Sequence, residues 1–313
     1  MTTYDFKDSE LESLRDKTVL ITGASTGIGR DTVKLAHQYG ANIAVGDWNA
    51  VEGEKLAAEL GDRVLFHKTD VSNFSDVVAL FEAAHAKFGI INAVLSNHGI
   101  SNENFLADEF DAAGKLLPPN MKTIDVNLTG TVYVAKLAAH YFRKWPDVRC
   151  QLVMTGSAAS FVDTPPLHLY CASKAGILGL MRSLRTQVLK NDNFTVNMIA
   201  PWMTSMCSLH LRSPHNSAQF LYMERDMLRP VPVTAMLPDA IRKLWGSLPT
   251  NETWGVGRAI LLPVVRPDVN GKSLFVGGHQ IVDFEDKLHE TQPLWMGEQM
   301  SKDMDAGQLI MIP

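Results

Sequence analysis

A glycine-rich turn between a buried strand and a helix constrains the fold of this chain more than any other feature. Residues 18–22 form a short unbroken apolar run, the kind that is buried on both faces of a parallel sheet. Residues 22–29 follow as Thr-Gly-Ala-Ser-Thr-Gly-Ile-Gly and lead into a helix that we expect at about 28–39, ended by Gly40. Glycine lets the backbone turn tightly and lets a phosphate come close, while the helix N-terminus supplies N–H groups and a positive dipole end. The turn therefore predicts a dinucleotide phosphate site, and a plain strand-to-helix connection is the alternative.

The alternation of strand and helix continues through most of the chain. Further short apolar strands are predicted at 42–46, 63–67, 91–96, 150–154, 194–199 and 273–276. Helices are predicted up to Leu60, at 75–88, at about 120–144 and around Tyr170. Such alternation is typical of right-handed crossovers in a doubly wound parallel sheet. We therefore predict an α/β, Rossmann-like sheet of about seven strands flanked by helices, as a single domain over residues 1–313 with its core at about 15–280.

Four segments fall outside this alternation. Residues 1–16 are expected to be an arm that docks or frays, and 100–118 form a polar, irregular insertion. Residues 203–232 are rich in Met, Leu, Phe and Tyr, which predicts a flexible apolar substrate lid; packing against the core or a subunit interface is the alternative. Two more helices are expected at about 234–248 and 253–262. The tail, 279–313, is polar with apolar anchors at Leu294, Trp295 and Met296.

The composition excludes several classes of protein. The 313 residues are 46% hydrophobic and 20% charged, with a net charge of −5, which gives no basis for a nucleic-acid or anionic-membrane partner. Cys150, Cys171 and Cys207 form no disulfide framework and lack metal-ligand spacing, so we predict no metal site and free thiols in a reducing compartment. The N-terminus is polar and acidic, unlike a signal peptide, and no apolar run approaches membrane-spanning length. We therefore expect a cytoplasmic protein.

Aspartates follow the second and third predicted strands. Asp47, followed by Trp48, stands where a carboxylate can bind both ribose hydroxyls of an adenosine and would repel a 2′-phosphate. No arginine is adjacent in the sequence and Ser25 occupies the turn, so this position favours NAD over NADP; an ordinary strand-end aspartate is the alternative. Asp70 and Val71 could meet the adenine edge, or Asp70 could instead cap a helix.

A serine, a tyrosine and a lysine are spaced so that they can form a proton-transfer site. Ser157 follows the strand predicted at 150–154, and Tyr170 and Lys174 lie one turn apart on one face of a predicted helix. An ammonium beside a phenol favours the phenolate and lowers the tyrosine pKa. A serine hydroxyl opposite can bond a substrate oxygen, so the three predict chemistry on an alcohol–ketone couple. For the Tyr–Lys pair alone, an amphipathic helix with a surface lysine is the alternative.

Several separated motifs together make residues of about 15–280 resemble a short-chain dehydrogenase/reductase of the classical type. The matching residues, in chain order, are Thr22, Gly23, Gly27 and Gly29 of the glycine motif, then Asp70, Asn97, Gly99, Asn127, Ser157, Tyr170 and Lys174. Around Asn97 the chain departs from the pattern, because Ser96 and His98 stand in place of the usual Asn and Ala. The match of four separated elements in order indicates more than a shared fold.

The resemblance implies roles for these residues. Ser157 would hold the substrate oxygen, Tyr170 would exchange the proton, and Lys174 would lower the tyrosine pKa and bind the nicotinamide ribose. Asn127 would anchor a water that links Lys174 to solvent. The relatives also imply a homodimer or homotetramer, paired through the helices at about 120–144 and 170–190. The predicted cofactor contacts are Gly23, Ser25, Thr26, Gly27, Ile28, Gly29, Asp47, Trp48, Asp70, Val71, Asn97, Gly99, Tyr170, Lys174, Pro201 and Thr204.

The chain departs from the family pattern after its sixth strand. Pro201 is followed by Trp202 rather than glycine, and Met206 stands where a threonine is usual. Thr204 is therefore expected to hold the nicotinamide amide, and Trp202 to narrow the site or stack on a ring. His98 is expected to be a structural histidine.

These observations predict an NAD-dependent oxidoreductase that transfers a hydride between its cofactor and a hydrophobic secondary alcohol or ketone. The wall opposite the lid is expected from residues 165–168 (Pro-Pro-Leu-His). An NADPH-dependent ketoreductase of a biosynthetic pathway, in secondary metabolism, is one alternative, and a non-redox isomerase or cyclase is another. A non-catalytic dinucleotide-binding or regulatory protein is a third, against which the intact Ser157, Tyr170 and Lys174 argue.

Overall fold

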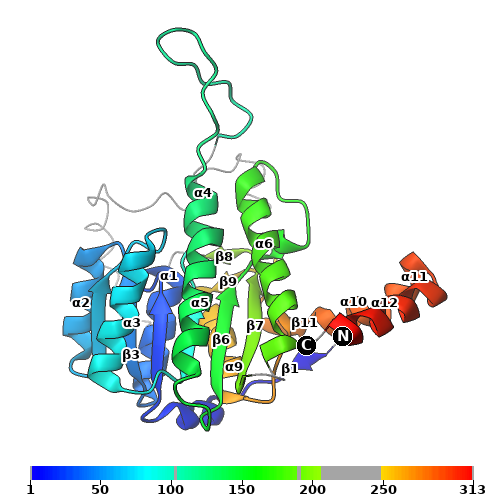
Figure 1. The fold of residues 1–313 in the computed structure, drawn as a ribbon. Coiled ribbons are helices and arrows are strands. Elements are labelled where there is room, and N and C mark those ends of the chain that lie inside the picture. Colours follow the sequence, from blue (N-terminus) through cyan, green and yellow to red (C-terminus); the bar gives the residue numbers. More distant parts are fainter. Residues whose placement is uncertain (1, 102–103, 189–191, 206–247, 312–313) are drawn as a thin grey trace.

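The computed structural model describes residues 2–101, 104–188, 192–205 and 248–311, which are built around one large sheet (Figure 1). Its strands run in the order β1-β11-β10-β7-β6-β5-β2-β3-β4. The seven from β10 to β4 pair in parallel, so the Rossmann-like α/β fold is confirmed. The parallel strands are β2 (Thr18–Thr22), β3 (Asn42–Asp47), β4 (Val64–Lys68), β5 (Ala93–Ser96), β6 (Cys150–Thr155), β7 (Phe194–Pro201) and β10 (Ser273–Gly277).

Helices cover both faces of this sheet and bury an apolar core on each. One face carries η1 (Asp8–Leu14), α1 (Gly27–Gln38), α2 (Ala50–Leu60) and α9 (Thr253–Val265), through buried side chains such as Leu11, Val33, Leu56 and Ile260. The other carries α3 (Phe74–Phe88), α5 (Gly130–Phe142) and α6 (His168–Leu184), through Leu80, Val134 and Ile177. This second set of helices stands in front of the sheet in Figure 1.

Two antiparallel strands extend the sheet beyond β10, so the expected count of about seven rises to nine. β11 (Gln280–Asp283) folds back on β10 through Gly278 and His279, whose φ angles of 55° and 65° are both positive, as a type I′ hairpin turn requires. β1 (Thr3–Tyr4) then pairs with β11, with Thr3 opposite Val282. The N-terminal arm therefore docks on the sheet edge.

The tail is more regular than the sequence pattern predicts. After β11 it forms three helices, α10 (Glu285–Glu290), α11 (Gln292–Met296) and α12 (Glu298–Met311). Figure 1 shows them in orange and red, extending away from the edge of the sheet that β1 and β11 form.

Two other segments differ from expectation in detail, and the insertion agrees with it. The helix expected at about 120–144 is divided into α4 (Lys122–Ile124), a π-helical turn η2 (Asp125–Thr129) and α5. The insertion is irregular, as expected, and forms a loop that projects from the body, closed by a bridge between Phe110 and Leu116 (Figure 1). α9 runs to Val265, past its expected end at 262, with Pro263 inside it.

Part of the prediction falls outside the described residues. These are the helix expected at about 234–248, apart from its last residue, and the lid beyond residue 205. The short strands β8 (Thr204–Ser205) and β9 (Asn251–Glu252) pair with each other on either side of that gap. Among the helices of the described ranges, none combines the length and apolar character needed to span a membrane.

Candidate active site

The carboxyl ends of four neighbouring strands bring the predicted site residues to one edge of the sheet. Gly23 follows β2, Asn97 follows β5, Ser157 comes shortly after β6 and Trp202 follows β7. In an open α/β sheet, ligands bind outside the carboxyl ends of the strands where the strand order reverses, which here is between β2 and β5. Residues from the predicted cofactor set and from the predicted catalytic set therefore lie at the same edge of the sheet.

The glycine turn has the geometry that its sequence predicts. Gly23 and Gly27 have φ angles of 67° and 58°, in the left-handed region that favours glycine. A Cβ added at Gly23 would lie 2.5 Å from Cα of His98, and one at Gly29 would lie 2.3 Å from the carbonyl oxygen of Gly23. A side chain at either position would therefore break the turn.

The helix that follows this turn begins without a side-chain cap. Thr26 is its N-cap residue, and its side chain makes no capping hydrogen bond. The first N–H groups of an α-helix have no partner within the helix and favour an anion. The start of α1, from Gly27 and Ile28 onward, thus fits the pyrophosphate of a dinucleotide.

Asp47 ties the glycine turn to the loop after β3. It is 8% exposed, and its carboxylate accepts hydrogen bonds from the backbone N–H of Ser25 (2.9 Å) and of Asn49 (3.0 Å). Each carboxylate oxygen has a further lone pair, so Asp47 retains the capacity to accept from a ribose hydroxyl. Trp48 is 72% exposed beside it.

An arginine that the sequence analysis missed lies against the same turn. Arg30 donates from Nη1 to the carbonyl oxygen of Ser25 (3.3 Å) and to Glu52 Oε2 (3.2 Å), and from Nη2 to Glu59 Oε2 (2.9 Å). Lys34 also pairs with Glu59, at 2.7 Å. The sequence shows no arginine next to Asp47, but in the fold both side chains bind the backbone of Ser25, Asp47 at its N–H and Arg30 at its carbonyl oxygen.

Asp70 and Val71, which follow β4, make contacts with nearby residues of the chain. The Asp70 carboxylate accepts from the N–H (3.0 Å) and the hydroxyl (2.6 Å) of Ser72. The cap of α3 is Asn73, which accepts from the N–H of Ser75, so the interpretation of Asp70 as the helix cap is wrong. Val71 is buried, and a Cβ added at Gly130 would lie 2.9 Å from its Cγ2 atom.

The structure brings the serine, the tyrosine and the lysine together. Ser157 is the N-cap of a short 3-10 helix, η3 (Ala158–Ser160), and its side chain hydrogen-bonds that of Tyr170. Lys174 is 3% exposed; its Nζ donates to the carbonyl oxygen of Thr155 (2.7 Å) and lies 5.6 Å from the centroid of the Tyr170 ring. A phenol, a hydroxyl and an ammonium therefore meet at the carboxyl end of β6.

Burial shifts the pKa values of both Tyr170 and Lys174. Burial raises the pKa of Tyr170 above its usual value, and the hydrogen bond with Ser157 only partly opposes this. Burial also lowers the pKa of Lys174 to about 8. Burial therefore dominates the pKa of both groups in this structure, and the lowering of the tyrosine pKa by Lys174 stays a prediction.

Asn127 lies in the π-helical turn η2 and joins three parts of the site. Its side chain accepts from the N–H of Ile100 (2.8 Å) and donates to the carbonyl oxygen of Ile100 (2.9 Å) and to the hydroxyl of Ser173 (3.1 Å). Gly99 lies beside it, since a Cβ added there would be 3.4 Å from Nζ of Lys174 and 3.5 Å from Oδ1 of Asn127. π-Helical turns are frequent at functional sites because the extra residue displaces a side chain from the helical register.

His98 and Asn97 stabilise the site through hydrogen bonds to neighbouring residues. His98 is 6% exposed and hydrogen-bonds Thr22 (2.7 Å) and Thr131 (3.4 Å) through its two ring nitrogens. Burial and the nearby charge of Lys174 lower the His98 pKa to about 3, so this histidine is neutral near pH 7, in line with a structural role. Asn97 donates to the carbonyl oxygen of Gly23 (3.0 Å) and accepts from the hydroxyl of Thr155 (3.2 Å), which connects the glycine turn to β6.

The segment after β7 is anchored by Asn251. Its Nδ2 donates to the carbonyl oxygen of Val276 (2.8 Å) and also bonds that of Trp202. The Trp202 ring lies 6.2 Å from that of Phe275, so its packing partner is on β10. Pro201, before Trp202 in the chain, and Thr204, after it, are half-buried. The Thr204 hydroxyl lies 3.4 Å from the carbonyl oxygen of Trp202.

Two serines that the sequence analysis missed hold the catalytic candidates in place. The Ser160 hydroxyl accepts from the N–H of Ser157 (3.3 Å) and donates to the carbonyl oxygen of Lys174 (2.8 Å). Ser173 donates to the carbonyl oxygen of Tyr170 (2.7 Å). The Ser-x-x-Ser spacing from 157 to 160, typical of a capping box, was the signal for the first of them.

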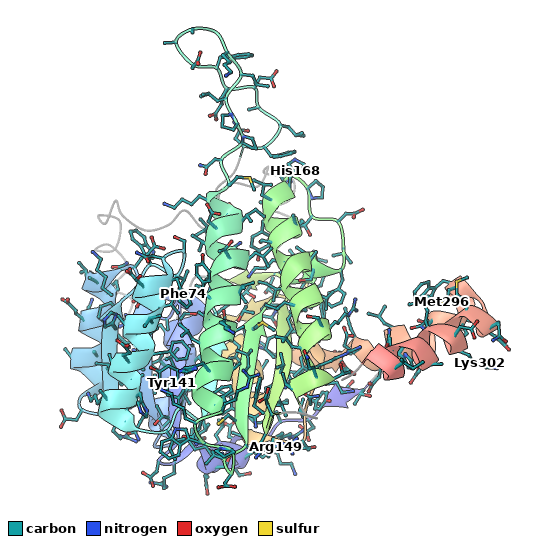
Figure 2. The ribbon with its side chains drawn as sticks, viewed as in Figure 1. Phe74, Tyr141, Arg149, His168, Met296 and Lys302 are labelled. Carbon is teal, nitrogen blue, oxygen red and sulfur yellow. The ribbon has the colours of Figure 1, made fainter. Side chains whose placement is uncertain are left out.

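The predicted wall before Tyr170 lies at the open end of α6. Figure 2 shows His168 there, at the same end as the projecting insertion. The rings of His168 and Phe105 lie 5.7 Å apart, so the insertion contacts the helix that carries the tyrosine.

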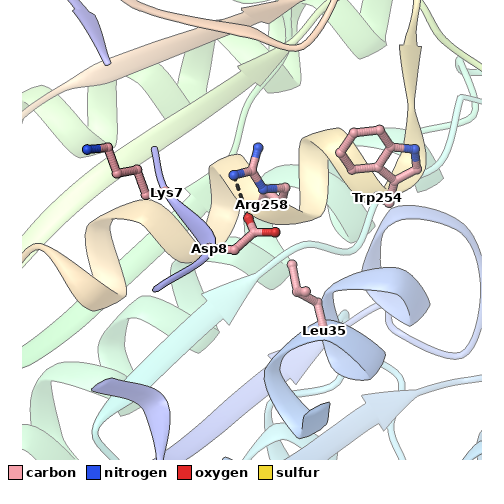
Figure 3. A pocket seen from close by; sticks show the side chains of 5 residues that line it. All are labelled: Lys7, Asp8, Leu35, Trp254 and Arg258. Carbon is pink, nitrogen blue, oxygen red and sulfur yellow. Dashed lines mark ion pairs between the residues drawn. The ribbon is translucent and has the colours of Figure 1, made fainter. Parts of the chain in front are cut away.

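The structure also has a hollow that lies apart from the predicted active site. It has a volume of about 600 Å³ and is lined by Lys7, Asp8, Leu35, Trp254 and Arg258 (Figure 3). Asp8 and Arg258 form an ion pair across it at 2.6 Å. None of the predicted catalytic or cofactor residues lines it.

Among the described residues, no group of His, Cys, Asp and Glu side chains is arranged to hold a metal ion.

The fold and these residues define a class of protein, the Rossmann-like oxidoreductases that use NAD(P)(H). Residues 17–214 match the family model described as short chain dehydrogenase. The chain therefore belongs to the short-chain dehydrogenase/reductase family, in its classical form, and is an enzyme acting on CH–OH groups of small molecules.

Individual relatives agree with this assignment. The short-chain dehydrogenase/reductase prx4 of Penicillium roqueforti is 28% identical over 300 residues, which cover 95% of this chain and 85% of the relative. The 5′-hydroxyaverantin dehydrogenase of Dothistroma septosporum is 32% identical over 212 residues, which cover 62% of this chain and 69% of the relative. The crystal structure of 3-ketoacyl-(acyl-carrier-protein) reductase from Brucella melitensis complexed with NADH has the same fold, with a TM-score of 0.66 at 22% identity, covering 85% of this chain and 98% of that one.

Proposed function

We propose that this protein is an NAD-dependent dehydrogenase that interconverts a hydrophobic secondary alcohol and its ketone. The observation that carries the proposal is the contact between Ser157 and the half-buried Tyr170, one turn from the buried Lys174. These groups lie at the same sheet edge as an uncapped helix N-terminus that fits a pyrophosphate.

The chain's own residues would position the substrate and move the proton. When bound, the nicotinamide supplies the acceptor for the hydride that leaves the carbinol carbon, or the donor in the reverse direction. Ser157 holds the substrate oxygen, and Tyr170 takes its hydroxyl proton in oxidation or returns a proton in reduction. Lys174 places its ammonium beside the phenol and would bind the nicotinamide ribose. Asn127 holds Ile100 and Ser173 in place, and a bound water would link it to Lys174.

A preference for NAD rests on charges around the ribose end of the turn. Asp47 supplies a buried carboxylate against the N–H of Ser25, and a 2′-phosphate there would face it directly. Arg30 could favour a 2′-phosphate, but Glu52 and Glu59 already bind its guanidinium. That arginine is the specific observation that favours an NADPH-dependent ketoreductase as the second candidate function.

A hydrophobic substrate is supported by the surroundings of the tyrosine. Phe105 is 46% exposed and Val162 is 56% exposed, on segments next to the start of α6. The relative named 5′-hydroxyaverantin dehydrogenase is consistent with a polycyclic aromatic alcohol as one candidate. We therefore propose a medium-sized apolar alcohol, in secondary metabolism.

We extend the proposal to the organisation of the protein. Residues 1–313 would form one domain that self-associates as a homodimer or homotetramer, in the cytoplasm, without nucleic acid or membrane as a partner. The net charge of −5 supports the last point.

The test combines a substrate screen with one variant. Hydrophobic secondary alcohols are supplied with NAD or NADP while the absorbance of the reduced cofactor is followed, and NAD is expected to give the faster turnover. Tyr170→Phe is expected to lower kcat at least about 100-fold with the cofactor Kd within about twofold of wild type. Tighter binding of NADPH than of NADH would support the ketoreductase instead. Product formation without a change in cofactor absorbance would support an isomerase or cyclase.

A further inference from the structure

The side-chain amide of Asn251 joins the chain after β7 to the hairpin after β10. Asn251 is fully buried at the start of β9. Its Nδ2 atom donates to the carbonyl oxygens of Trp202 and of Val276 (2.8 Å for the latter), and its Oδ1 atom accepts from the N–H of His279 (2.9 Å). Both N–H bonds of the amide are therefore used, and both point to backbone oxygens.

The backbone of Asn251 holds the same segment a second time. Its N–H donates to the carbonyl oxygen of Met203 (2.8 Å), and Asn251 stands opposite Thr204 in the β8–β9 pair. Met203 has a φ angle of 29°, which is unusual for a residue other than glycine and persists only where neighbouring contacts hold it. Contacts from one residue thus reach three successive positions, 202 to 204.

The unusual Trp202 is part of this anchor. Its N–H donates to the carbonyl oxygen of Val276 (2.9 Å), and its ring lies 6.2 Å from that of Phe275. A Cβ added at Gly277 would lie 3.6 Å from Cε3 of the ring. The ring and the N–H of Trp202 therefore contact β10, while its carbonyl oxygen binds Asn251.

The strand order places this segment at the nicotinamide end of the cofactor in the proposed function. The start of α1, after β2, fits the pyrophosphate, and the ring that reacts beside Tyr170 must lie near the carboxyl end of β6. The next strand beyond β6, on the side away from β2, is β7. Neighbouring strands lie about 4.8 Å apart, so the ends of β2 and β7 are about 14 Å apart along this edge. Residues 202–204 therefore follow the strand that flanks the ring on the side away from the pyrophosphate.

Thr204 supplies a hydroxyl in this segment. The hydroxyl lies 3.4 Å from the carbonyl oxygen of Trp202, which is longer than the roughly 2.5–3.0 Å of a usual O–H···O bond. That carbonyl oxygen already accepts from Asn251, so the hydroxyl is weakly engaged and can turn to a ligand. A carboxamide offers both N–H donors and an oxygen acceptor, so it is complementary to a hydroxyl that donates and accepts.

We propose that Asn251 is a positioning residue for the nicotinamide half of the cofactor site. Through the backbone of Trp202 and Met203 it fixes Thr204 where the hydroxyl binds the carboxamide of the nicotinamide. The inference rests on the proposed function, because it needs a nicotinamide beside Tyr170. Asn251 itself touches neither cofactor nor substrate and acts through the segment that it holds.

The first experiment separates the two halves of the cofactor. The Kd values of NADH and of ADP-ribose, which lacks the nicotinamide, are measured by isothermal titration calorimetry. Asn251→Ala is expected to raise the Kd of NADH about 5–20-fold, the effect of losing one or two hydrogen bonds, and to leave that of ADP-ribose within about twofold. Asn251→Asp keeps the shape of the side chain but loses both donors, so it should weaken NADH binding at least as much.

Asn197→Ala is the matched control. Asn197 is also fully buried, and it binds the chain just before β10, donating to the carbonyl oxygen of Val269 (2.8 Å) and accepting from the N–H of Lys272 (3.0 Å). Its loss should leave the ratio of the two Kd values unchanged, because general loosening of these strands affects both ligands alike. Equal weakening of both ligands by Asn251→Ala, or a selective loss of NADH binding in Asn197→Ala, overturns this inference alone. A wild type without affinity for NADH overturns the proposed function and this inference with it.

A second variant keeps the proposal falsifiable if Asn251→Ala does not fold, which circular dichroism reveals. Thr204→Val removes the hydroxyl at a half-buried position and should raise the Kd of NADH about fivefold without changing that of ADP-ribose. In the double variant Asn251→Asp/Thr204→Val, the Kd should exceed that of the weaker-binding single variant by less than about twofold, because both changes remove the same contact. An unchanged Kd of NADH in Thr204→Val, or fully additive effects in the double variant, overturns the proposal.

Discussion

The side-chain amide of Asn127 binds both backbone groups of Ile100, accepting from its N–H at 2.8 Å and donating to its carbonyl oxygen at 2.9 Å. Ile100 is the point where the chain leaves β5 for the projecting insertion, and Gly99 just before it lies beside Lys174. One buried amide thus holds the backbone between the cofactor side and the proton-transfer side of the site.

Replacing Asn127 by Ala should lower kcat about 10–100-fold, because a displacement of about 1 Å in a catalytic group has effects of that size. Cofactor Kd should change less than kcat, which separates positioning from binding. Asn104→Ala, on the exposed insertion, is the control and should leave both unchanged. Equal kinetics for the Asn127 variant and the wild type would contradict a positioning role.

Lys174 should weaken the fold while it serves the chemistry. Burial lowers its pKa from 10.5 to about 8, so the folded state releases its proton more readily than the unfolded state. The cost is fully present below pH 8 and diminishes as pH rises through 8 to 10.5. We expect Lys174→Met to raise the free energy of unfolding at pH 7 by about 1–3 kcal/mol and to abolish turnover. Urea denaturation measures the first, and an unchanged or lower stability would contradict this prediction.

The raised pKa of Tyr170 predicts a pH dependence of the reaction. Oxidation of an alcohol needs the phenolate as base, and burial makes the phenolate scarcer at neutral pH. The value of kcat/KM for oxidation should therefore increase with pH through the neutral and alkaline range, whereas reduction, which uses the phenol, should be fastest on the neutral side. Initial rates in both directions across pH check this; an oxidation rate independent of pH would show that cofactor binding has already lowered the tyrosine pKa.

His98 should make the fold sensitive to acid. Its pKa is about 3 in the folded protein and near 6.5 when unfolded, so its contribution is fully present above pH 6.5 and is lost as pH falls toward 3. At pH 4.5 the loss in the free energy of unfolding amounts to about 2–3 kcal/mol. His98→Gln should show a smaller loss of stability between pH 7 and 4.5, while His140→Gln, at an exposed position, should behave like the wild type. Identical acid profiles for all three proteins would rule this out.

The ion pairs of Arg30 give a prediction about cofactor choice. Glu52→Gln/Glu59→Gln frees the guanidinium next to Ser25, so binding of NADPH relative to NADH should increase about 5–30-fold, the effect of about 1–2 kcal/mol. Adding Arg30→Met to that double variant should reverse the gain. A double variant with unchanged cofactor preference would show that Arg30 lies too far from the ribose.

Much of the sheet was predictable because parallel strands buried on both faces are short apolar runs, and residues 18–22 and 194–199 have that pattern. β11 was missed although its signal is local: Gly278, with a positive φ angle, stands at the tight turn that precedes Gln280–Asp283. The helices of the tail, α10 to α12, were missed because large apolar residues in it, such as Leu294, Trp295 and Met300, are exposed rather than packed as an apolar face on the core.

The candidate site was predictable from spacing but its electrostatics were not. The i,i+4 separation placed Tyr170 and Lys174 on one helix face, yet it carries no information on desolvation, which governs both pKa values here. Arg30 was missed for a related reason. The sequence shows only which residues are next to Asp47 in the chain, whereas α1 brings the Arg30 guanidinium to the carbonyl oxygen of Ser25 in the glycine turn.

The pairing of Thr3 with Val282 has a consequence for how this protein is made. The partner of the first strand leaves the ribosome only after nearly all of the described chain, so the outermost edge of the sheet stays open throughout synthesis. Until then residues 3–4 and the outer side of β10 have no strand partner, and bringing them together requires closure across the whole chain. A released chain truncated before residue 280 should therefore keep the parallel strands of the sheet but have an N-terminus that a protease removes more readily than that of the full chain.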